Sequence, residues 1–436
     1  MSFSRTVYSA LMWCARPLLL RKLRRRAVAE PGYGHAVEER FGHYGPAATA
    51  AAAAAAKGDA PAGPLVWIHA VSLGETRAAA ILLNALRTQL PGMRLLLTHG
   101  TATGRAEGAK LLQPGDLQAW QPWDTPGAVG RFLEHFRPAM GVLMETEIWP
   151  NLVAGCRRRG IALVLANARL NEKSLAGARR WAWLARPAYA GLSAVWAQTE
   201  ADAERLRAAG ARVEGVFGNL KFDVVPDAAQ LAQGRAWRDA SPRPVVLLAS
   251  SREGEEALWL DALQSTPESM ANDGVQWLVV PRHPQRVAEV RQRIEAAGLT
   301  VSSRSGWAIT PGVADVWLGD SLGEMALYYG LAHAALLGGS FAPLGGQNLI
   351  EAAACGCPVV AGPHTFNFAE AARLACEAGA ALRVADMAEG VAAAQALVHD
   401  AAALAATRER ALAFTQMHRG AAQATAAAVV QQLKGR

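Results

Sequence analysis

Short apolar runs alternate with helix-forming stretches through both halves of this chain, and that alternation restricts the fold more than any other feature. In the first half the runs are Leu65–His69, Leu95–Thr98, Met140–Met144, Ile161–Ala166, Ala194–Gln198 and Val213–Phe217. In the second half they are Val245–Ala249, Trp277–Pro281, Val316–Leu318, Ala334–Leu337, Val359–Ala361 and Ala380–Val384. Strands that alternate with helices predict an α/β fold, in which helices cover both faces of a parallel sheet.

The length of the chain and a proline-containing polar stretch predict two such domains. At 436 residues the chain exceeds the usual size of a single core. The boundaries that we expect are an apolar and basic segment at 1–30, a first doubly wound domain at 31–225, a linker at 226–242, a second domain at 243–415, and a C-terminal helix at 416–436. The alanine run at 50–56, bounded by Pro46 and Pro61, is predicted to be a surface insertion. A cleft between two domains is the usual place for a binding site.

Charge and cysteine content narrow the functional classes. The formal net charge of +7 favours an acidic partner without distinguishing nucleic acid, lipid phosphate and sugar acid. The five cysteines are odd in number and form no C-x-x-C pair, which favours a reducing compartment without a structural zinc site. The chain also lacks a G-x-x-x-x-G-K-[ST] loop, a strand-borne G-x-S-x-G and an H-E-x-x-H motif.

The first residues combine an apolar stretch with a basic flank. Arg5, Arg16 and Pro17 interrupt Phe3–Leu20, so the stretch falls short of the ~20 apolar residues that a spanning helix needs. A basic cluster follows directly: Arg21, Lys22, Arg24, Arg25 and Arg26. In a signal peptide the charges would come before the apolar part. We therefore expect a helix that lies on an anionic membrane surface. A terminal helix packed on the domain is the second alternative, and a spanning helix ranks below both.

A glycine-rich segment at Leu336–Ala354 predicts an anion site in the second half. An apolar run, two glycine pairs and a helix start follow one another, with Asn348 and Glu351 at the helix. Such a turn offers backbone N–H groups to a phosphate, although a tight turn with a helix cap explains the same residues. Basic or glycine-containing loops that begin at Ser250, Pro281 and Gly362 follow other predicted strands and are expected at the same sheet edge.

Carboxylates follow two predicted strands of the first half. Ser72 and Glu75 have capping-box spacing, and Glu75 is also placed to act as a general base. The tetrapeptide Ser-Leu-Gly-Glu at 72–75 recurs at 321–324. From the residues alone, either half could therefore hold the base, or both tetrapeptides could be helix caps. Glu145 and Glu147 form a second acidic pair before Pro150. Metal ligation by this pair is conceivable, but no neighbouring His or Asp completes a set.

As an ordered set, several motifs resemble the signature blocks of the 3-deoxy-D-manno-octulosonic acid (Kdo) transferase family. They are His69–Glu75, Glu145–Asn151, Ala166–Leu170, Gly218–Asp223, Pro281–Pro284, Gly338–Phe341 and Gly362–Phe368. They span most of the chain, and the alanine-rich stretch at 47–62 departs from the pattern. The resemblance implies a GT-B glycosyltransferase with two facing Rossmann-like domains, an interdomain cleft, and a C-terminal helix that returns toward the first domain.

The resemblance also implies an activity. Such an enzyme would move Kdo from CMP-Kdo to a lipid A precursor (lipid IVA) in lipopolysaccharide synthesis, with inversion and without metal or cofactor, at the cytoplasmic side of the inner membrane. It implies no nucleic-acid partner and no obligate protein partner. Glu75 would be the base, with Glu145 or Glu147 as a second essential acid, and Glu324 would be structural. Donor-binding residues would be Ser251, Arg252, Pro281, Arg282, His283, Gly339, Ser340, Gly345, Gly346, Asn348 and Glu351. Acceptor-side residues would be Ser72, Gly74, Arg77 and Thr101.

Two other functions remain open from the sequence. One is a GT-B enzyme that uses a different activated sugar. The other is a nucleotide-sugar or nucleic-acid binding module that uses its positive charge without catalysis.

Overall fold

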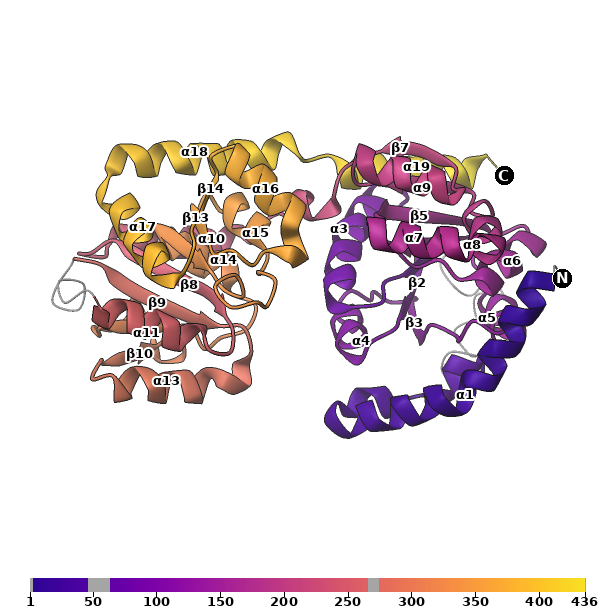
Figure 1. Cartoon of the computed structure of the whole chain (residues 1–436), viewed down its shortest axis with the longest axis horizontal. Coiled ribbons are helices and arrows are strands. Elements are labelled where there is room, and N and C mark those ends of the chain that lie inside the picture. The colour runs from indigo at the N-terminus through magenta and orange to yellow at the C-terminus, as the bar shows by residue number, and fades with distance from the viewer. Residues whose placement is uncertain (1–2, 46–62, 266–273, 436) are drawn as a thin grey trace. The chain divides into compact units, whose positions relative to one another are not determined.

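The computed structural model describes residues 3–45, 63–265 and 274–435, and it divides the chain into two compact units. Unit 1 comprises Met1–Asp223 together with Arg419–Arg436, and unit 2 comprises Val224–His418. Each unit holds a sheet surrounded by helices (Figure 1). The predicted alanine-rich insertion lies outside the described residues.

Unit 1 is built on a parallel seven-stranded sheet with the order β3-β2-β1-β4-β5-β6-β7. Its strands are β1 (Leu65–His69), β2 (Arg94–His99), β3 (Leu117–Trp120), β4 (Met140–Met144), β5 (Ala162–Ala168), β6 (Ala194–Ala197) and β7 (Val213–Val216). Residue Val66 of β1 pairs with Leu95 of β2 on one side and Met140 of β4 on the other. The order therefore reverses between β1 and β4, which makes the carboxyl ends of these two strands the switch point of the sheet.

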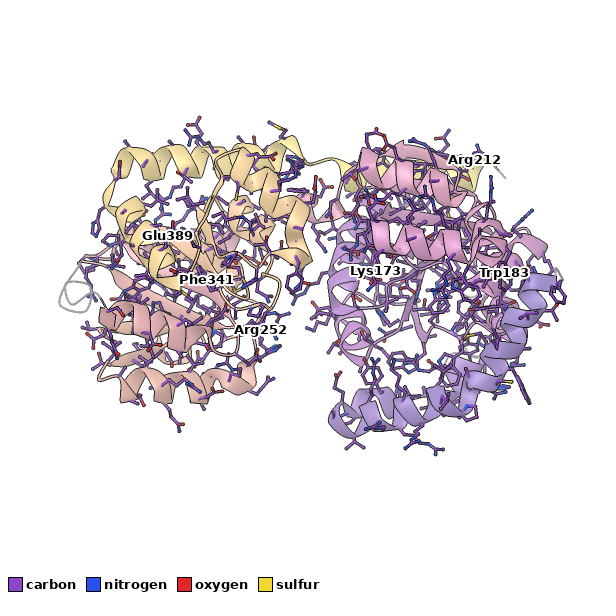
Figure 2. All side chains as sticks on the ribbon, viewed as in Figure 1. Lys173, Trp183, Arg212, Arg252, Phe341 and Glu389 are labelled. Carbon is purple, nitrogen blue, oxygen red and sulfur yellow. The ribbon has the colours of Figure 1, made fainter. Side chains whose placement is uncertain are left out.

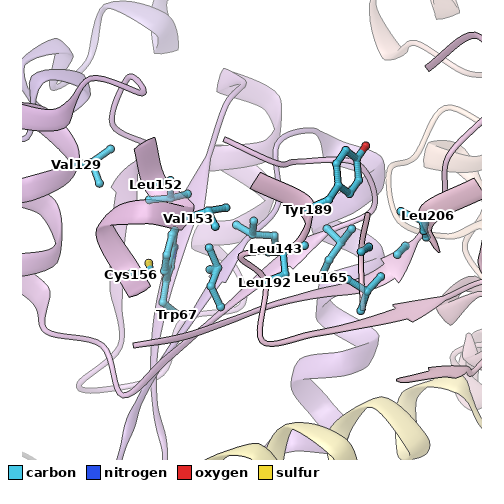
Figure 3. Close-up of a cluster of buried hydrophobic side chains, with 14 of the residues drawn as sticks. Trp67, Val129, Leu143, Leu152, Val153, Cys156, Leu165, Tyr189, Leu192 and Leu206 are labelled. Carbon is cyan, nitrogen blue, oxygen red and sulfur yellow. The ribbon is translucent and has the colours of Figure 1, made fainter. Parts of the chain in front are cut away.

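Helices cover both faces of this sheet. They are α1 (Phe3–Ala29), α3 (Leu73–Gln89), α4 (Ala102–Ala109), α5 (Pro126–Phe136), α6 (Pro150–Arg158), α7 (Glu172–Arg180), α8 (Ala182–Tyr189), α9 (Glu200–Ala209) and α19 (Ala421–Lys434), with 3-10 turns η1 (Pro31–Gly34), η2 (Val37–Phe41) and η3 (Leu220–Asp223). Trp67 of β1 packs in the core shown in Figure 3, whereas its neighbours Val66 and Ile68 pack in a second core. The strand is apolar on both sides because both sides are covered.

Helix α19 belongs to unit 1 although it ends the chain. Its Ala422, Ala426 and Val429 are buried in the second core, and the helix packs on α3. The Asp223 carboxylate accepts hydrogen bonds from the N–H groups of Gly420 (2.6 Å) and Ala422 (2.7 Å). A carboxylate at this position satisfies N–H groups that have no partner within the helix.

Unit 2 repeats the architecture with a parallel sheet of order β10-β11-β9-β8-β12-β13-β14. The strands are β8 (Val245–Ser251), β9 (Gln276–Pro281), β10 (Val301–Ser303), β11 (Val316–Leu318), β12 (Ala334–Leu337), β13 (Val359–Ala361) and β14 (Ala381–Arg383). The helices are α10 (Ala228–Asp239), α11 (Glu255–Ser265), α13 (Val287–Ala296), α14 (Met325–Leu331), α15 (Leu349–Ala354), α16 (Ala369–Glu377), α17 (Met387–His399) and α18 (Ala401–Met417), with 3-10 turns η4 (Pro284–Arg286), η5 (Arg304–Gly306) and η6 (Phe366–Phe368). The switch point of this sheet lies between β8 and β12.

The expected linker at 226–242 is wrong, because this stretch folds as helix α10 within unit 2. Asp227 caps the helix, and Trp237 is buried. At Gly234 a Cβ atom would lie 2.1 Å from the carbonyl oxygen of Leu327, so glycine allows α10 to pack closely against α14. The polar residues and prolines of this stretch do not indicate a helix in the sequence, because tertiary packing stabilises the helix.

Helix α1 packs on unit 1 and also exposes apolar side chains. The Ser9 hydroxyl lies 3.1 Å from Asn151 Oδ1, and the Arg26 guanidinium lies 5.6 Å from the centre of the Tyr33 ring. Its exposed large apolar residues are Phe3, Leu11, Trp13, Leu18 and Val28. Within residues 3–45, 63–265 and 274–435, no helix combines the length and the apolar character needed to cross a membrane.

Candidate active site

The predicted catalytic carboxylates of the first domain gather at the switch point of unit 1. Glu75 lies in the first turn of α3, after β1, whereas Glu145 and Glu147 follow the neighbouring strand β4. Burial raises the pKa of Glu75, and charge repulsion from both of these acidic groups adds to the rise. The topology therefore places these three side chains within electrostatic range of one another at the sheet edge where α/β folds bind ligands.

Glu75 is both part of a helix cap and a carboxylate with a shifted pKa. Its Oε2 accepts a hydrogen bond from the Val71 N–H at 2.8 Å, and its own N–H lies 3.4 Å from the Ser72 hydroxyl oxygen. The capping-box pattern is therefore present, but the carboxylate reaches Val71, not the Ser72 N–H. Burial raises the pKa of Glu75 to about 7, against the effect of its hydrogen bonds. A carboxyl group with this pKa can accept a proton near neutral pH.

Glu145 is held in an ion-pair cluster. It is 3% exposed, and its carboxylate lies 2.7 Å from Arg169 and 3.8 Å from Lys221 Nζ. Its backbone has a φ of +56°, a left-handed conformation that is uncommon for a residue with a side chain. Asn167 has a similar φ of +52°, and its side chain accepts the Leu220 N–H beside Lys221. Backbone strain of this kind is often found at functional sites.

Glu147 differs from Glu145 in its environment. Its Oε2 accepts a hydrogen bond from Trp149 Nε1 at 2.9 Å. Burial raises its pKa, and repulsion from Glu145 adds to the effect. The pair therefore divides into one carboxylate neutralised by cations and one that faces an indole donor.

The acceptor-side residues border the same loop. Thr101 caps α4, and its hydroxyl donates to the Val71 carbonyl at 2.9 Å. Arg77 is exposed and pairs with Glu107 at 3.3 Å. A Cβ atom at Gly74 would meet no protein atom within 4 Å. Protein packing therefore does not require glycine there, and a closely approaching substrate remains a prediction.

The predicted donor residues of unit 2 lie at the carboxyl ends of β8, β9 and β12. The Arg282 N–H donates to the Ser251 carbonyl at 2.9 Å, and Arg282 Nε donates to Gln347 Oε1 at 3.2 Å. His283 follows at the start of η4, where burial and then neighbouring arginines lower its pKa. The structure thus brings together Arg282 and the second glycine turn. Ser251 faces inward instead, and its hydroxyl donates to the buried Glu256 at 2.6 Å.

The N–H groups of the first glycine turn already have partners within the protein, so the donor-binding role of Gly339 and Ser340 stays a prediction. The Glu255 carboxylate accepts the N–H groups of Gly339 (2.6 Å), Phe341 (3.0 Å) and Ala342 (3.3 Å). Ser340 is buried, and its hydroxyl accepts the Gly362 N–H at 2.8 Å. An internal carboxylate therefore takes the place that the sequence suggested for a phosphate.

The second glycine pair forms a turn that leads into helix α15. Gly345 and Gly346 have φ values of +92° and +74°, and the Gly346 N–H donates to the Gly339 carbonyl at 2.7 Å. Asn348 caps α15 through the Ile350 N–H at 3.2 Å, and Glu351 lies in the first turn of that six-residue helix. Pro281 ends β9. Glu324, expected to be structural, pairs with Arg304 at 2.9 Å.

Three residues of these sites, Arg169, Lys221 and Glu255, were not predicted from the sequence. Arg169 and Lys221 stood in the recognised motifs but received no role. Glu255 is one of two acidic residues after Gly254, at the start of α11. That position was a possible signal, since acidic residues favour the first turn of a helix. In the three described ranges, no group of three or more His, Cys, Asp or Glu side chains could hold a metal ion.

Two parallel doubly wound sheets, each with its own switch point, define the class of protein by its architecture, the GT-B fold. The fold is similar to that of Anabaena HepE crystallised with UDP-glucose, with a TM-score of 0.54 and 16% identity over 85% of this chain and 100% of that chain. At that identity the likeness concerns the fold alone. The predicted fold class is confirmed.

The sequence comparisons identify the family. Residues 35–224 match the family model described as 3-deoxy-D-manno-octulosonic-acid transferase (kdotransferase). The chain is 48% identical over 388 residues to the 3-deoxy-D-manno-octulosonic acid transferase of Bordetella pertussis, covering 85% of this chain and 88% of the relative. It is 30% identical to the Haemophilus influenzae transferase of that name, covering 87% of each. The chain belongs to the Kdo transferase family, which confirms the predicted family and the predicted enzyme and removes the non-catalytic alternative.

Proposed function

We propose that this enzyme transfers Kdo from CMP-Kdo to lipid IVA, a lipid A precursor, in lipopolysaccharide synthesis. The observation that carries the proposal is Glu75, a carboxylate with a pKa of about 7 at the switch point of unit 1 in a member of the Kdo transferase family. The acceptor is an alcohol, which needs a base to become a good nucleophile. Unit 2 would hold the nucleotide through the loops that carry Arg252 and Arg282.

In the proposed reaction the Glu75 carboxylate takes the proton from the acceptor hydroxyl. The acceptor oxygen forms a bond to the anomeric carbon of Kdo, and the bond between that carbon and the CMP phosphate oxygen breaks. CMP leaves with the electron pair of the broken bond. Attack from the face opposite the leaving group inverts the anomeric centre. The cationic side chains of Arg252 and Arg282 would stabilise the charge on the departing phosphate without a metal ion.

The test is a transfer assay on the purified full-length chain with CMP-Kdo and tetra-acylated lipid A precursor. We expect the lipid to gain the mass of Kdo and CMP to be released, with the anomeric configuration of the product read by NMR. Glu75→Gln should abolish transfer but retain CMP binding, whereas Glu204→Gln on the exposed surface of α9 should retain both. A folded wild-type enzyme that gave no product, or that used another activated sugar instead, would contradict the proposal.

We also propose that α1 holds the enzyme on the cytoplasmic face of the inner membrane. Trp13 is 65% exposed and Leu18 69% exposed on this helix. A surface hollow of about 600 Å³ on the same helix is lined by Leu18, Arg21, Lys22, Arg25, Arg26 and Ala29. Exposed apolar and aromatic side chains beside a basic cluster suit an anionic lipid surface.

Flotation with vesicles of phosphatidylethanolamine and anionic phosphatidylglycerol tests the membrane proposal. The variant Leu11→Ser/Trp13→Ser/Leu18→Ser should lose vesicle binding, because it removes exposed apolar area while leaving the buried Leu23 in place. A matched Leu258→Ser variant removes an exposed apolar side chain from unit 2 and should float like the wild type. Undiminished flotation of the triple variant would place the anchor on another surface.

A further inference from the structure

The most unusual feature of unit 2 is the negative charge at its switch point. Glu255 and Glu256 begin α11, and they are 0% and 1% exposed. Glu256 is accounted for, because its two oxygens each lie 2.9 Å from an Arg286 guanidinium nitrogen. Glu255 differs, because within the described residues its carboxylate accepts hydrogen bonds from four backbone N–H groups.

Those partners come from two loops. The Arg252 N–H (2.9 Å) and the Gly339 N–H (2.6 Å) donate to Oε2, whereas the Phe341 N–H (3.0 Å) and the Ala342 N–H (3.3 Å) donate to Oε1. Figure 2 labels Arg252 and Phe341, one from the loop after β8 and one from the turn after β12. Because both oxygens accept two N–H groups, the arrangement is one that an ionised carboxylate satisfies.

Backbone N–H groups that converge in this way form a nest for an anion. At the switch point of a doubly wound sheet, such a nest commonly binds a nucleotide phosphate. Here the Glu255 carboxylate occupies that position. A phosphate that approached it would find no unpartnered donor among these four N–H groups and would face a like charge.

We propose that Glu255 is a specificity-determining residue that restricts the donor to nucleotides with one phosphate. This inference rests on the proposed CMP-Kdo donor, because a CMP-sugar carries one phosphate whereas a nucleoside diphosphate sugar carries two. The single phosphate would bind toward Arg252 and Arg282, outside the nest. The second phosphate of a diphosphate donor would have to enter the nest, where Glu255 repels it. The same contacts tie the loop after β8 to the turn after β12, so Glu255 also fixes the shape of the donor side.

The test compares CMP with CDP, which share a nucleoside and differ by one phosphate. Isothermal titration calorimetry on the full-length wild-type chain should give CDP an affinity about tenfold or more below that of CMP. In Glu255→Ala, the ratio of CDP affinity to CMP affinity should rise by about tenfold or more. Glu255→Gln should give a smaller rise, because it removes the charge but keeps most of the volume.

A matched control separates an opened nest from a general change in charge. Glu253 is exposed in the same loop, so Glu253→Gln removes one negative charge and leaves the nest filled. Its CDP to CMP ratio should stay close to that of the wild type, and a rise equal to that of Glu255→Ala would overturn the inference. Far-UV circular dichroism and thermal melting confirm that each variant is folded.

The wild-type measurement decides the matter even if the Glu255 variants do not fold. Wild-type protein that binds CDP as tightly as CMP overturns the inference and leaves the proposed transfer reaction standing. Wild-type protein that binds neither nucleotide overturns the proposed donor, and this inference falls with it. Transfer of Kdo in the assay above, combined with equal CMP and CDP affinities, would separate the two proposals completely.

Discussion

Replacing Glu75 by glutamine should stabilise the protein while it removes the proposed base. The pKa of this carboxyl rises from 4.5 to about 7 in the folded chain, mainly through burial. At ~1.4 kcal/mol for each pH unit, the folded state disfavours the ionised form by about 3 kcal/mol. Glutamine keeps the shape: its oxygen can accept the Val71 N–H, and its amide can donate to the Ser72 hydroxyl, at the two contacts that the carboxylate now makes.

The sign of the pH dependence follows from proton binding. Between pH 4.5 and about 7 the folded state holds a proton on Glu75 that the unfolded state has lost. The free energy of unfolding of the wild type therefore falls as pH rises through this window, and the loss is complete above the folded pKa. Glu75→Gln does not lose this stability, because glutamine does not ionise. Its advantage should be close to zero below pH 4.5 and reach about 3 kcal/mol at pH 8.

Scanning calorimetry of wild type and variant at pH 5 and pH 8 measures this difference. For a unit of this size, about 3 kcal/mol corresponds to a rise of roughly 6–12 °C in the Tm of unit 1. The exposed Glu204→Gln variant controls for a lost surface charge and should show no pH-dependent gain. A Tm difference that is the same at both pH values, or larger at pH 5, would refute the buried carboxylate as its source.

Three further predictions concern the base, the C-terminal helix and the glycine turn. The transfer rate should rise with pH up to about 7 and then level off as Glu75 loses its proton; a pH–rate profile that is flat from pH 5 to 8 would contradict this role. Asp223→Ala should destabilise unit 1 by about 1 kcal/mol, because α19 loses its cap. Hydrogen exchange in 421–434 should then be faster, and unchanged exchange there would show that the cap is dispensable. Ser340→Ala should cost about 1–3 kcal/mol of unfolding free energy in urea titrations, because the Gly362 N–H loses its buried acceptor; an unaltered midpoint would mean that the N–H finds another partner.

The central strands could be predicted from the sequence, as could the edge strands β7 and β14, whereas the other edge strand of each sheet could not. Leu65–His69, Met140–Met144 and Ala334–Leu337 were predicted with the bounds that the structure gives them. They are buried on both faces, so they consist of continuous apolar runs. The strands β3 and β10 were missed. Both lie at a sheet edge, where one side has no partner strand, and β10 contains only three residues, two of them serine.

The candidate site shows a similar division. Glu75 was predictable because its cap, Ser72, is a neighbour in the sequence. The occupied nest was not, because Glu255 lies 84 residues before Gly339, and only the pairing of β8 with β12 brings them together. Likewise, the cations around Glu145 come from residues 169 and 221, after β5 and within η3. Local spacing predicts a cap, but the partner of a buried charge depends on the order of strands in the sheet.

The chain order of unit 1 has a consequence for biosynthesis. This unit begins the chain, yet α19 supplies Ala421, Ala422, Ala426 and Val429 to one of its two cores. A domain made on the ribosome can complete its core only when all of its segments have emerged. During translation, the core on the α3 side of unit 1 therefore lacks the side chains of α19 until all 195 residues of unit 2, Val224–His418, have been synthesised. A chain truncated after His418 would contain all of unit 2 but would lack the part of the unit 1 core that α19 supplies.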